Sequence, residues 1–163
     1  DARLTALAEQ WGSGPPNVLV VPNFSVGAVL MMRFAELAAP HFAASEIIEL
    51  HHDRKADAPS GTALATAAGM REAGGRQERS TESEELVDGA RGADAAGVRV
   101  HSVRLPGLLA HQEVLLGSQG ETLTIRHDTT DRVAFRPGVL LGIRGVIGLS
   151  APVTVGLEGL LGL

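Results

Sequence analysis

The sequence predicts an α+β fold, in which a mixed β-sheet carries helices on one face. Three observations predict it. Strand-like and helical patterns alternate in the first half of the chain, a run of strand-like segments follows, and one more helical pattern comes after that run. Two of the later strand-like segments are joined by a short polar turn and form a hairpin. No internal repeat or coiled-coil heptad is visible.

The first elements come before a sharp break in the pattern. Residues 1–12 predict a helix that ends at Gly12 and is followed by a turn at 13–16. Residues 18–21 are a continuous apolar run, which predicts a short strand buried on both faces. The Pro-Asn-Phe-Ser sequence at 22–25 then ends that strand.

A second helix is predicted from about residue 25 to residue 42, largely buried near its start. Residues 46–51 predict the next strand, and 57–61 form a loop. The alanine-rich segment from residue 62 to about residue 73 predicts a third helix. A polar stretch at 74–97 is expected to be a mobile surface connection.

The later part of the chain predicts strands at 98–105, 112–116 and 121–127, the last two joined by a turn at 117–120. In 121–127, Leu123 and Ile125 alternate with polar residues, so one face of that strand should be buried.

A last helix should begin at Pro137, because proline suits the first helical position, and it should run to about residue 147. The tail at 152–163 is apolar with glycine breaks.

Composition excludes several classes of function. The chain has 163 residues, 44% of them hydrophobic, which is typical of a globular protein with a core. A net charge of -5 and an aromatic content of 3% argue against nucleic-acid binding. There is no cysteine, which excludes disulfides and thiolate sites and fits a reducing, cytoplasmic location. No apolar run reaches the roughly 18 residues that a membrane span needs.

The residues with chemical potential gather between the predicted strand at 46–51 and the helix that follows. His51, His52 and Lys55 lie at the strand end, and the sequence Pro-Ser-Gly-Thr at 59–62 opens the helix. Backbone N–H groups at a helix start bind carboxylates and phosphates well, and a lysine adds a cation. Histidine supplies a proton donor near neutral pH. This pattern predicts a site for a small anion, although a surface histidine pair beside an ordinary helix cap would give the same pattern.

The same segment resembles the signature of the dihydrodipicolinate reductases, also called 4-hydroxy-tetrahydrodipicolinate reductases. The resemblance rests on the sequence HHDRKADAPSGTA at 51–63. Three further segments resemble the family in the same order: PNFSVG at 22–27, HSVR at 101–104, and GETLTIRH at 120–127. Together these segments span most of residues 18–148.

The resemblance implies reduction of a cyclic unsaturated dicarboxylate by NADH or NADPH, in lysine and diaminopimelate synthesis. It makes His51 the general acid that protonates the substrate ring. Lys55 would be the second catalytic group. The substrate carboxylates would be bound by His52, Gly61 and Thr62, with Ser60 close by.

The cofactor contacts implied by the resemblance lie elsewhere in the chain. The nicotinamide side of the cofactor would be lined by Val21, Pro22, Asn23 and Phe24. Arg132 and Phe135 would approach the cofactor from the other end of the domain. The family also builds a homotetramer through its sheet, which would cover the second face of the hairpin.

The family begins with a doubly wound dinucleotide domain that carries Gly-x-x-Gly-x-x-Gly after its first strand. This sequence has no such motif in the required context. We therefore expect residues 1–24 to be the remnant of that Rossmann domain and 25–148 to be the substrate-binding and tetramerisation domain. Residues 149–163 would form a tail that returns to the cofactor domain, and this chain alone would be inactive.

Three other functions compete with the reductase. A metal hydrolase would use several of His51, His52, His101, His111 and His127, but adjacent histidines on a strand point to opposite faces and no acidic ligand has metal spacing. A hydrolase built on Ser60 lacks the Gly-x-Ser-x-Gly elbow. A non-catalytic oligomerisation module, or a decayed reductase, would not require histidine and lysine at 51 and 55.

Overall fold

The computed structural model describes residues 2–12, 17–77 and 83–163 of the chain. The predicted turn at 13–16 and part of the polar connection therefore lie outside the described residues. The chain forms two compact units, which are described separately. The first consists of residues 1–29 and 132–163, and the second of residues 30–131. Compact units within one chain are not the same as domains of a longer protein, so the predicted domain boundaries stay predictions.

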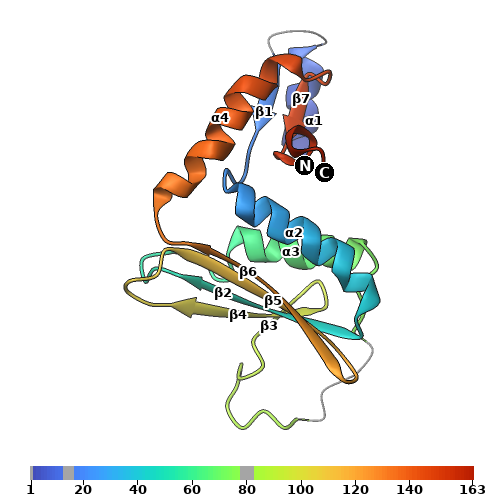
Figure 1. The fold of residues 1–163 in the computed structure, drawn as a ribbon, viewed down its shortest axis with the longest axis vertical. Coiled ribbons are helices and arrows are strands. Elements are labelled where there is room, and N and C mark those ends of the chain that lie inside the picture. The colour runs from blue at the N-terminus through green and yellow to red at the C-terminus, as the bar shows by residue number, and fades with distance from the viewer. Residues whose placement is uncertain (1, 13–16, 78–82) are drawn as a thin grey trace. The chain divides into compact units, whose positions relative to one another are not determined.

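The second unit is built on a five-stranded sheet (Figure 1). In spatial order its strands are β3 (Ala93–Ala95), β4 (Val98–Arg104), β2 (Ala44–His51), β5 (Ala110–Ser118) and β6 (Glu121–Thr129). Strands β2 and β4 are parallel, and the other neighbouring pairs are antiparallel. The predicted mixed sheet is confirmed.

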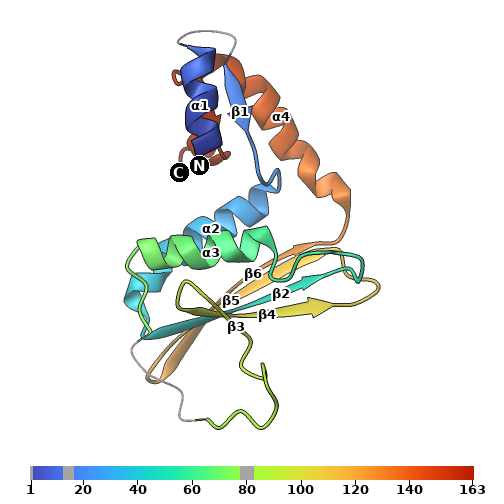
Figure 2. The ribbon, with the colours of Figure 1, turned by 180° about the vertical axis from the view of Figure 1, so that it is seen from behind.

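Two helices cover one face of this sheet, as Figures 1 and 2 show from opposite sides. They are α2 (Val26–Ala38), continued by a 3-10 turn at Ala39–His41, and α3 (Gly61–Glu72). The core lies between the helices and the sheet, with Ile47 at its centre and no exposed surface. Ile47 pairs with Val100 on one side and Val114 on the other, both buried. Burying a side chain of this size contributes roughly 1.5–3 kcal/mol.

The hairpin of β5 and β6 is longer than predicted. Gly117 and Ser118 pair with the opposite strand, so the predicted four-residue turn is wrong and only Gln119 and Gly120 connect the arms. Gly120 has a φ of +86°, which only glycine adopts without strain. The predicted alternation in β6 is only partly borne out. Ile125 packs against the core, whereas Leu123 is 38% exposed near the turn.

Strand β3 was not predicted, since it lies within the polar connection. A two-residue turn at Ala96 and Gly97 joins it to β4, and both turn residues have positive φ, of +53° and +83°. That geometry matches the twist of antiparallel strands. Asp94 accepts a hydrogen bond from the Gly97 N–H at 3.1 Å and supports the turn.

The first unit contains α1 (Ala2–Trp11), β1 (Val18–Val20), α4 (Arg136–Gly145), β7 (Val153–Val155) and α5 (Glu158–Leu161), with 3-10 turns at Arg132–Phe135 and Val146–Gly148. The strand and both longer helices were predicted, including Pro137 in the first turn of α4. The apolar tail supplies β7, which pairs in parallel with β1.

The prediction that β1 is buried on both faces is wrong for this chain. Its three residues are only partly buried, because β7 is its one paired neighbour among the described residues. Packing against α4 is close at Gly138, where an added Cβ would lie 2.0 Å from the carbonyl oxygen of Phe24. Within the described residues, no helix combines the length and apolar character that crossing a bilayer requires.

Candidate active site

The predicted site lies at the carboxyl ends of the two parallel strands of the second unit. His51 ends β2, Arg104 ends β4, and the two residues are partners in the strand register. Parallel strands bring their carboxyl ends to the same edge of a sheet, so their last side chains meet there. The chain then turns through residues 52–60 into α3, and a 3.2 Å hydrogen bond from the Lys55 N–H to the His52 carbonyl closes this turn.

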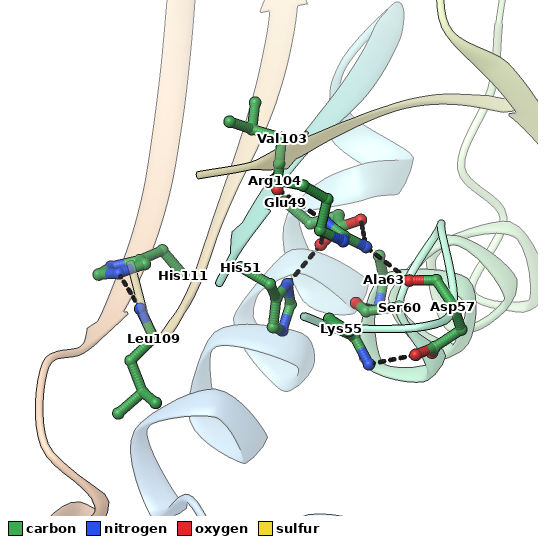
Figure 3. Close-up of polar contacts among 10 residues, drawn as sticks. All are labelled: Glu49, His51, Lys55, Asp57, Ser60, Ala63, Val103, Arg104, Leu109 and His111. Carbon is green, nitrogen blue, oxygen red and sulfur yellow. Dashed lines mark hydrogen bonds and ion pairs between the residues drawn. The ribbon is translucent and has the colours of Figure 1, made fainter. Parts of the chain in front are cut away.

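A buried carboxylate holds the ring of His51 (Figure 3). Glu49 lies two residues before His51 on β2, so both side chains project from the same face of the sheet. Glu49 Oε2 is 2.5 Å from His51 Nδ1, and the Glu49 side chain has no exposed surface. A charge buried in this way is costly unless it is paired and hydrogen-bonded.

Arg104 supplies that pairing from the neighbouring strand. Its Nη1 donates to Glu49 Oε2 at 3.0 Å and its Nη2 to Oε1 at 2.8 Å, a two-point contact of the kind that guanidinium and carboxylate groups favour. Burial would raise the pKa of Glu49, but hydrogen bonds from Arg104, Ser102 and His51 outweigh it and hold that pKa below its ordinary value. Glu49 is therefore ionised at neutral pH.

The same arginine connects the strands to the loop before α3. Its Nη2 also donates to the backbone carbonyl of Asp57 at 2.7 Å. The Asp57 carboxylate in turn accepts a hydrogen bond from Lys55 Nζ at 2.6 Å. Asp57 is 57% exposed, and exposed ion pairs of this kind contribute about 0–1 kcal/mol. An incoming anion can therefore compete for the Lys55 ammonium at little cost.

The groups around His51 have opposing effects on the pKa of its imidazole. Burial lowers the pKa of the imidazole, the Glu49 carboxylate raises it, and the positive charges of Lys55 and Arg104 lower it again. The net direction is downward from the ordinary value. The neutral and charged forms of His51 thus exchange on the acidic side of neutrality, where a small change in the local charge alters the balance.

The start of α3 is capped as the sequence predicted. The Ser60 hydroxyl accepts the Ala63 N–H at 3.2 Å, and the Ser60 side chain is buried. Gly61 and Thr62 form the first turn, whose N–H groups point out of the helix end and carry its positive partial charge. The first-turn N–H groups of Gly61 and Thr62 can donate hydrogen bonds to a carboxylate, while Ser60 caps the helix whether or not a ligand is bound.

His52 has a buried ring nitrogen that needs an explanation. Within the described part of the chain, its Nδ1 has no hydrogen-bond partner. An unpaired buried polar atom costs about 1–3 kcal/mol, so such atoms usually have a structural or functional reason.

The predicted cofactor residues lie in the first unit. Val21, Pro22, Asn23 and Phe24 lead from the end of β1 into α2, and the Asn23 side chain accepts the Ser25 N–H at 2.8 Å. Arg132 and Phe135 form the 3-10 turn before α4 in the same unit.

Two of the other strand histidines lie on the far face of the sheet, whereas His127 pairs with Gln112 in the strand register and lies on the same face as His51. His101 and His111 project from the opposite face of the sheet, where they contact Glu46 at 2.8 Å and Asp128 at 2.7 Å. Among the residues that the structure describes, no three potential metal ligands gather around one point.

Sequence reasoning missed Glu49 and Arg104. One signal could have found Glu49: an acidic residue two positions before a histidine on a buried strand shares its face and has to be paired. Arg104 could not be found in the same way, because its partnership depends on the register between β2 and β4.

Comparisons with known proteins identify the family of the chain. The sequence model described as "Dihydrodipicolinate reductase, C-terminus" matches residues 27–161. A 4-hydroxy-tetrahydrodipicolinate reductase from Cutibacterium acnes is 56% identical over 167 residues, covering 100% of this chain and 68% of that protein. The one from Nocardia farcinica is 59% identical over 160 residues, covering 94% of this chain and 63% of that protein.

A solved structure is also similar. It is described as a dipicolinate-bound dihydrodipicolinate reductase from Paenisporosarcina sp. TG-14, with a TM-score of 0.80 and 45% sequence identity. The match covers 97% of this chain and 58% of that chain. This chain therefore spans roughly two thirds or less of the length of the proteins it matches.

Proposed function

The chain belongs to the dihydrodipicolinate reductase family, and from this premise we propose that it carries the substrate-binding and catalytic part of a 4-hydroxy-tetrahydrodipicolinate reductase. With hydride from NADH or NADPH and one proton, the reaction would convert the cyclic dicarboxylate 4-hydroxy-tetrahydrodipicolinate to tetrahydrodipicolinate and release the hydroxyl group as water, in lysine and diaminopimelate synthesis. The observation that carries the proposal is the ring of His51, held by a buried ion pair at a strand end, with the Lys55 charge within reach.

The substrate would be bound through its two carboxylates. A dianion needs a cation and several N–H donors, and this segment offers the Lys55 ammonium and the first-turn amides at Gly61 and Thr62. The family resemblance adds His52 as a further carboxylate-binding residue. The similar protein from Paenisporosarcina is described as binding dipicolinate, a planar aromatic dicarboxylate, which supports a site of this chemistry.

The segment Val21–Phe24 fits the nicotinamide end of a cofactor. It leaves the carboxyl end of β1, a strand with a parallel neighbour, and ligands of open α/β sheets bind at such ends. When bound there, NADH or NADPH would supply the hydride. This segment offers no glycine-rich loop for a pyrophosphate.

The proton would come from His51. Its Nδ1 faces Glu49, which leaves Nε2 as the nitrogen that can donate to the substrate ring. Lys55 would hold a carboxylate or ring nitrogen of the substrate and stabilise the negative charge that the ring gains as it accepts the hydride. His51 and Lys55 belong to one short segment of the chain. The residue that binds the substrate and the residue that protonates it are therefore held close together by chain connectivity.

Replacing Thr62 by valine in the full-length protein should mainly raise KM, because it removes a polar group from the carboxylate-binding helix start and leaves His51 untouched. The measurement is steady-state oxidation of NADH or NADPH with the dicarboxylate substrate. Thr5→Val on the exposed face of α1 is the matched control and should change neither constant. A defect confined to kcat would show that Thr62 does not bind substrate.

The open face of the sheet supports a further part of the proposal, a homotetramer. The face away from the helices carries Ile48, Leu50 and Leu115. A shallow hollow of about 300 Å³ on this sheet is lined by residues that include Glu46, Leu115 and Thr124. Partly exposed apolar side chains on such a face favour contact with another sheet.

Light scattering of the full-length protein should give the mass of four copies, and the mass of a monomer at micromolar concentration would contradict this. A cytoplasmic location likewise stays a prediction.

A further inference from the structure

We propose that Glu49 is a positioning residue that holds His51 in its Nδ1–H form, so that Nε2 is always the nitrogen facing the substrate; this rests on the proposed function above. Glu49 lies outside the segments by which the family was recognised, and Arg104 lies within one of them but was given no role there. The proposal depends on the contacts of three side chains from two strands.

The geometry leaves only one arrangement of protons. Both Glu49 oxygens already accept hydrogen bonds from Arg104, at 3.0 and 2.8 Å, so this carboxylate is ionised and has no proton to donate. The 2.5 Å contact between Glu49 Oε2 and His51 Nδ1 therefore requires the proton on Nδ1. In neutral imidazole the other nitrogen then carries a lone pair, and in the charged form it carries the proton that can be donated.

The arrangement is rigid because its members are buried and cross-linked. Glu49 has no exposed surface, and Arg104 is 18% exposed. Arg104 also binds the Asp57 carbonyl, so the loop that carries Lys55 is tied to the same pair. A misplaced tautomer would turn a lone pair of Nδ1 toward the carboxylate, which is strongly unfavourable in a buried site.

Arg104 has a second effect, on the charge of the imidazole. A carboxylate alone beside His51 would favour the imidazolium strongly, whereas the cation on the far side of Glu49 offsets much of that attraction. The charged groups that act on His51 are Glu49 from its own strand, Arg104 from β4 and Lys55 from the loop. The Glu49–Arg104 pair thus determines which ring nitrogen of His51 faces the substrate, and it does so without keeping the ring permanently in its charged form.

The tautomer can be observed directly in the unmodified protein. In ¹⁵N spectra of histidine-labelled full-length protein above the His51 pKa, we expect His51 to show a pyrrole-type Nδ1 and a pyridine-type Nε2. The His51→Gln variant assigns the signals. An Nε2–H form, or an equal mixture of the two forms, would overturn the inference whether or not the protein is active.

Kinetics of Glu49→Gln provide the second test. Losing the negative charge should move the alkaline limb of the kcat profile to lower pH by about 1 unit and lower kcat at least about tenfold, with KM changed little. The direction follows because the acid form of His51 is required and Glu49 raises its pKa.

Glu46→Gln is the matched control for that variant. Glu46 lies on the same strand, contacts Arg91 and His101, and faces the opposite side of the sheet. This substitution should leave the pH profile in place. Equal shifts in both variants, or a folded Glu49→Gln protein with an unmoved limb, would reduce Glu49 to a structural role. An unmodified protein with no reductase activity would refute the proposed function instead, and the tautomer measurement would still stand.

Discussion

Replacing His51 by alanine in the full-length protein lowers kcat by about 10²- to 10⁴-fold, the usual contribution of a positioned general acid. Substrate binding should change far less, because the carboxylates would be held by Lys55 and the amides at the start of α3. The measurement is kcat and KM at a pH below the alkaline limb, where the acid form of His51 is present. The loss of stability should be smaller than in a variant of Arg104, since both hydrogen bonds from Arg104 to Glu49 remain.

His101→Ala is the control for this variant. His101 is a strand histidine that also contacts a glutamate, but it projects from the opposite face of the sheet. Its removal should leave kcat within about twofold, because a proton donor acts only within hydrogen-bond reach of its substrate. If His51→Ala also stays within twofold, His51 has no place in the mechanism.

Replacing Arg104 by methionine should cost about 3–5 kcal/mol of unfolding free energy, because it leaves the charge of Glu49 buried without its partner. Urea unfolding at fixed protein concentration measures the loss. The double variant Glu49→Leu/Arg104→Met should recover much of it, since replacing both members of a buried pair by apolar residues is often neutral. That double variant should nevertheless have low activity, because nothing orients His51.

Arg33→Met is the control for the single variant. Arg33 pairs with Glu36 at 2.9 Å on α2, and its side chain is 41% exposed. A helical surface pair of this spacing contributes about 0.2–0.5 kcal/mol, so the loss should be small. If Arg104→Met costs no more than Arg33→Met, the pair with Glu49 is not the stabilising contact that the buried geometry implies.

The main elements of the fold could be predicted because their patterns are local. Ser60 caps a helix in any sequence of this kind, and the alternation around Ile47 marks a strand with one buried face. The turn at Ala96 and Gly97 escaped prediction because its first residue, alanine, is unusual at positive φ. The length of the turn at Gly120 depends on how far the pairing of β5 with β6 extends. The hydrophobic pattern of one strand alone does not show where that pairing ends.

The candidate site was predictable only as far as one continuous segment reached. His51, Lys55 and the start of α3 lie within a few residues of each other, so their proximity follows from chain connectivity. Glu49 and Arg104 lie on separate strands, and their contact depends on the parallel register that sets His51 beside Arg104. The pairing of strands decides which charged residues are buried next to each other. A pattern within one segment of the sequence cannot show that pairing.

The central claim is that a dicarboxylate binds between the His51–Lys55 segment and the start of α3. Titration of dipicolinate into ¹⁵N-labelled full-length protein, followed by amide and imidazole chemical shifts, tests it most directly. We expect saturable shifts at the Gly61 and Thr62 amides and at the His51 and His52 rings, with the Glu46 and Thr124 amides unmoved. Shifts confined to the open face of the sheet, or no saturable shift at Gly61 and Thr62, would contradict the claim.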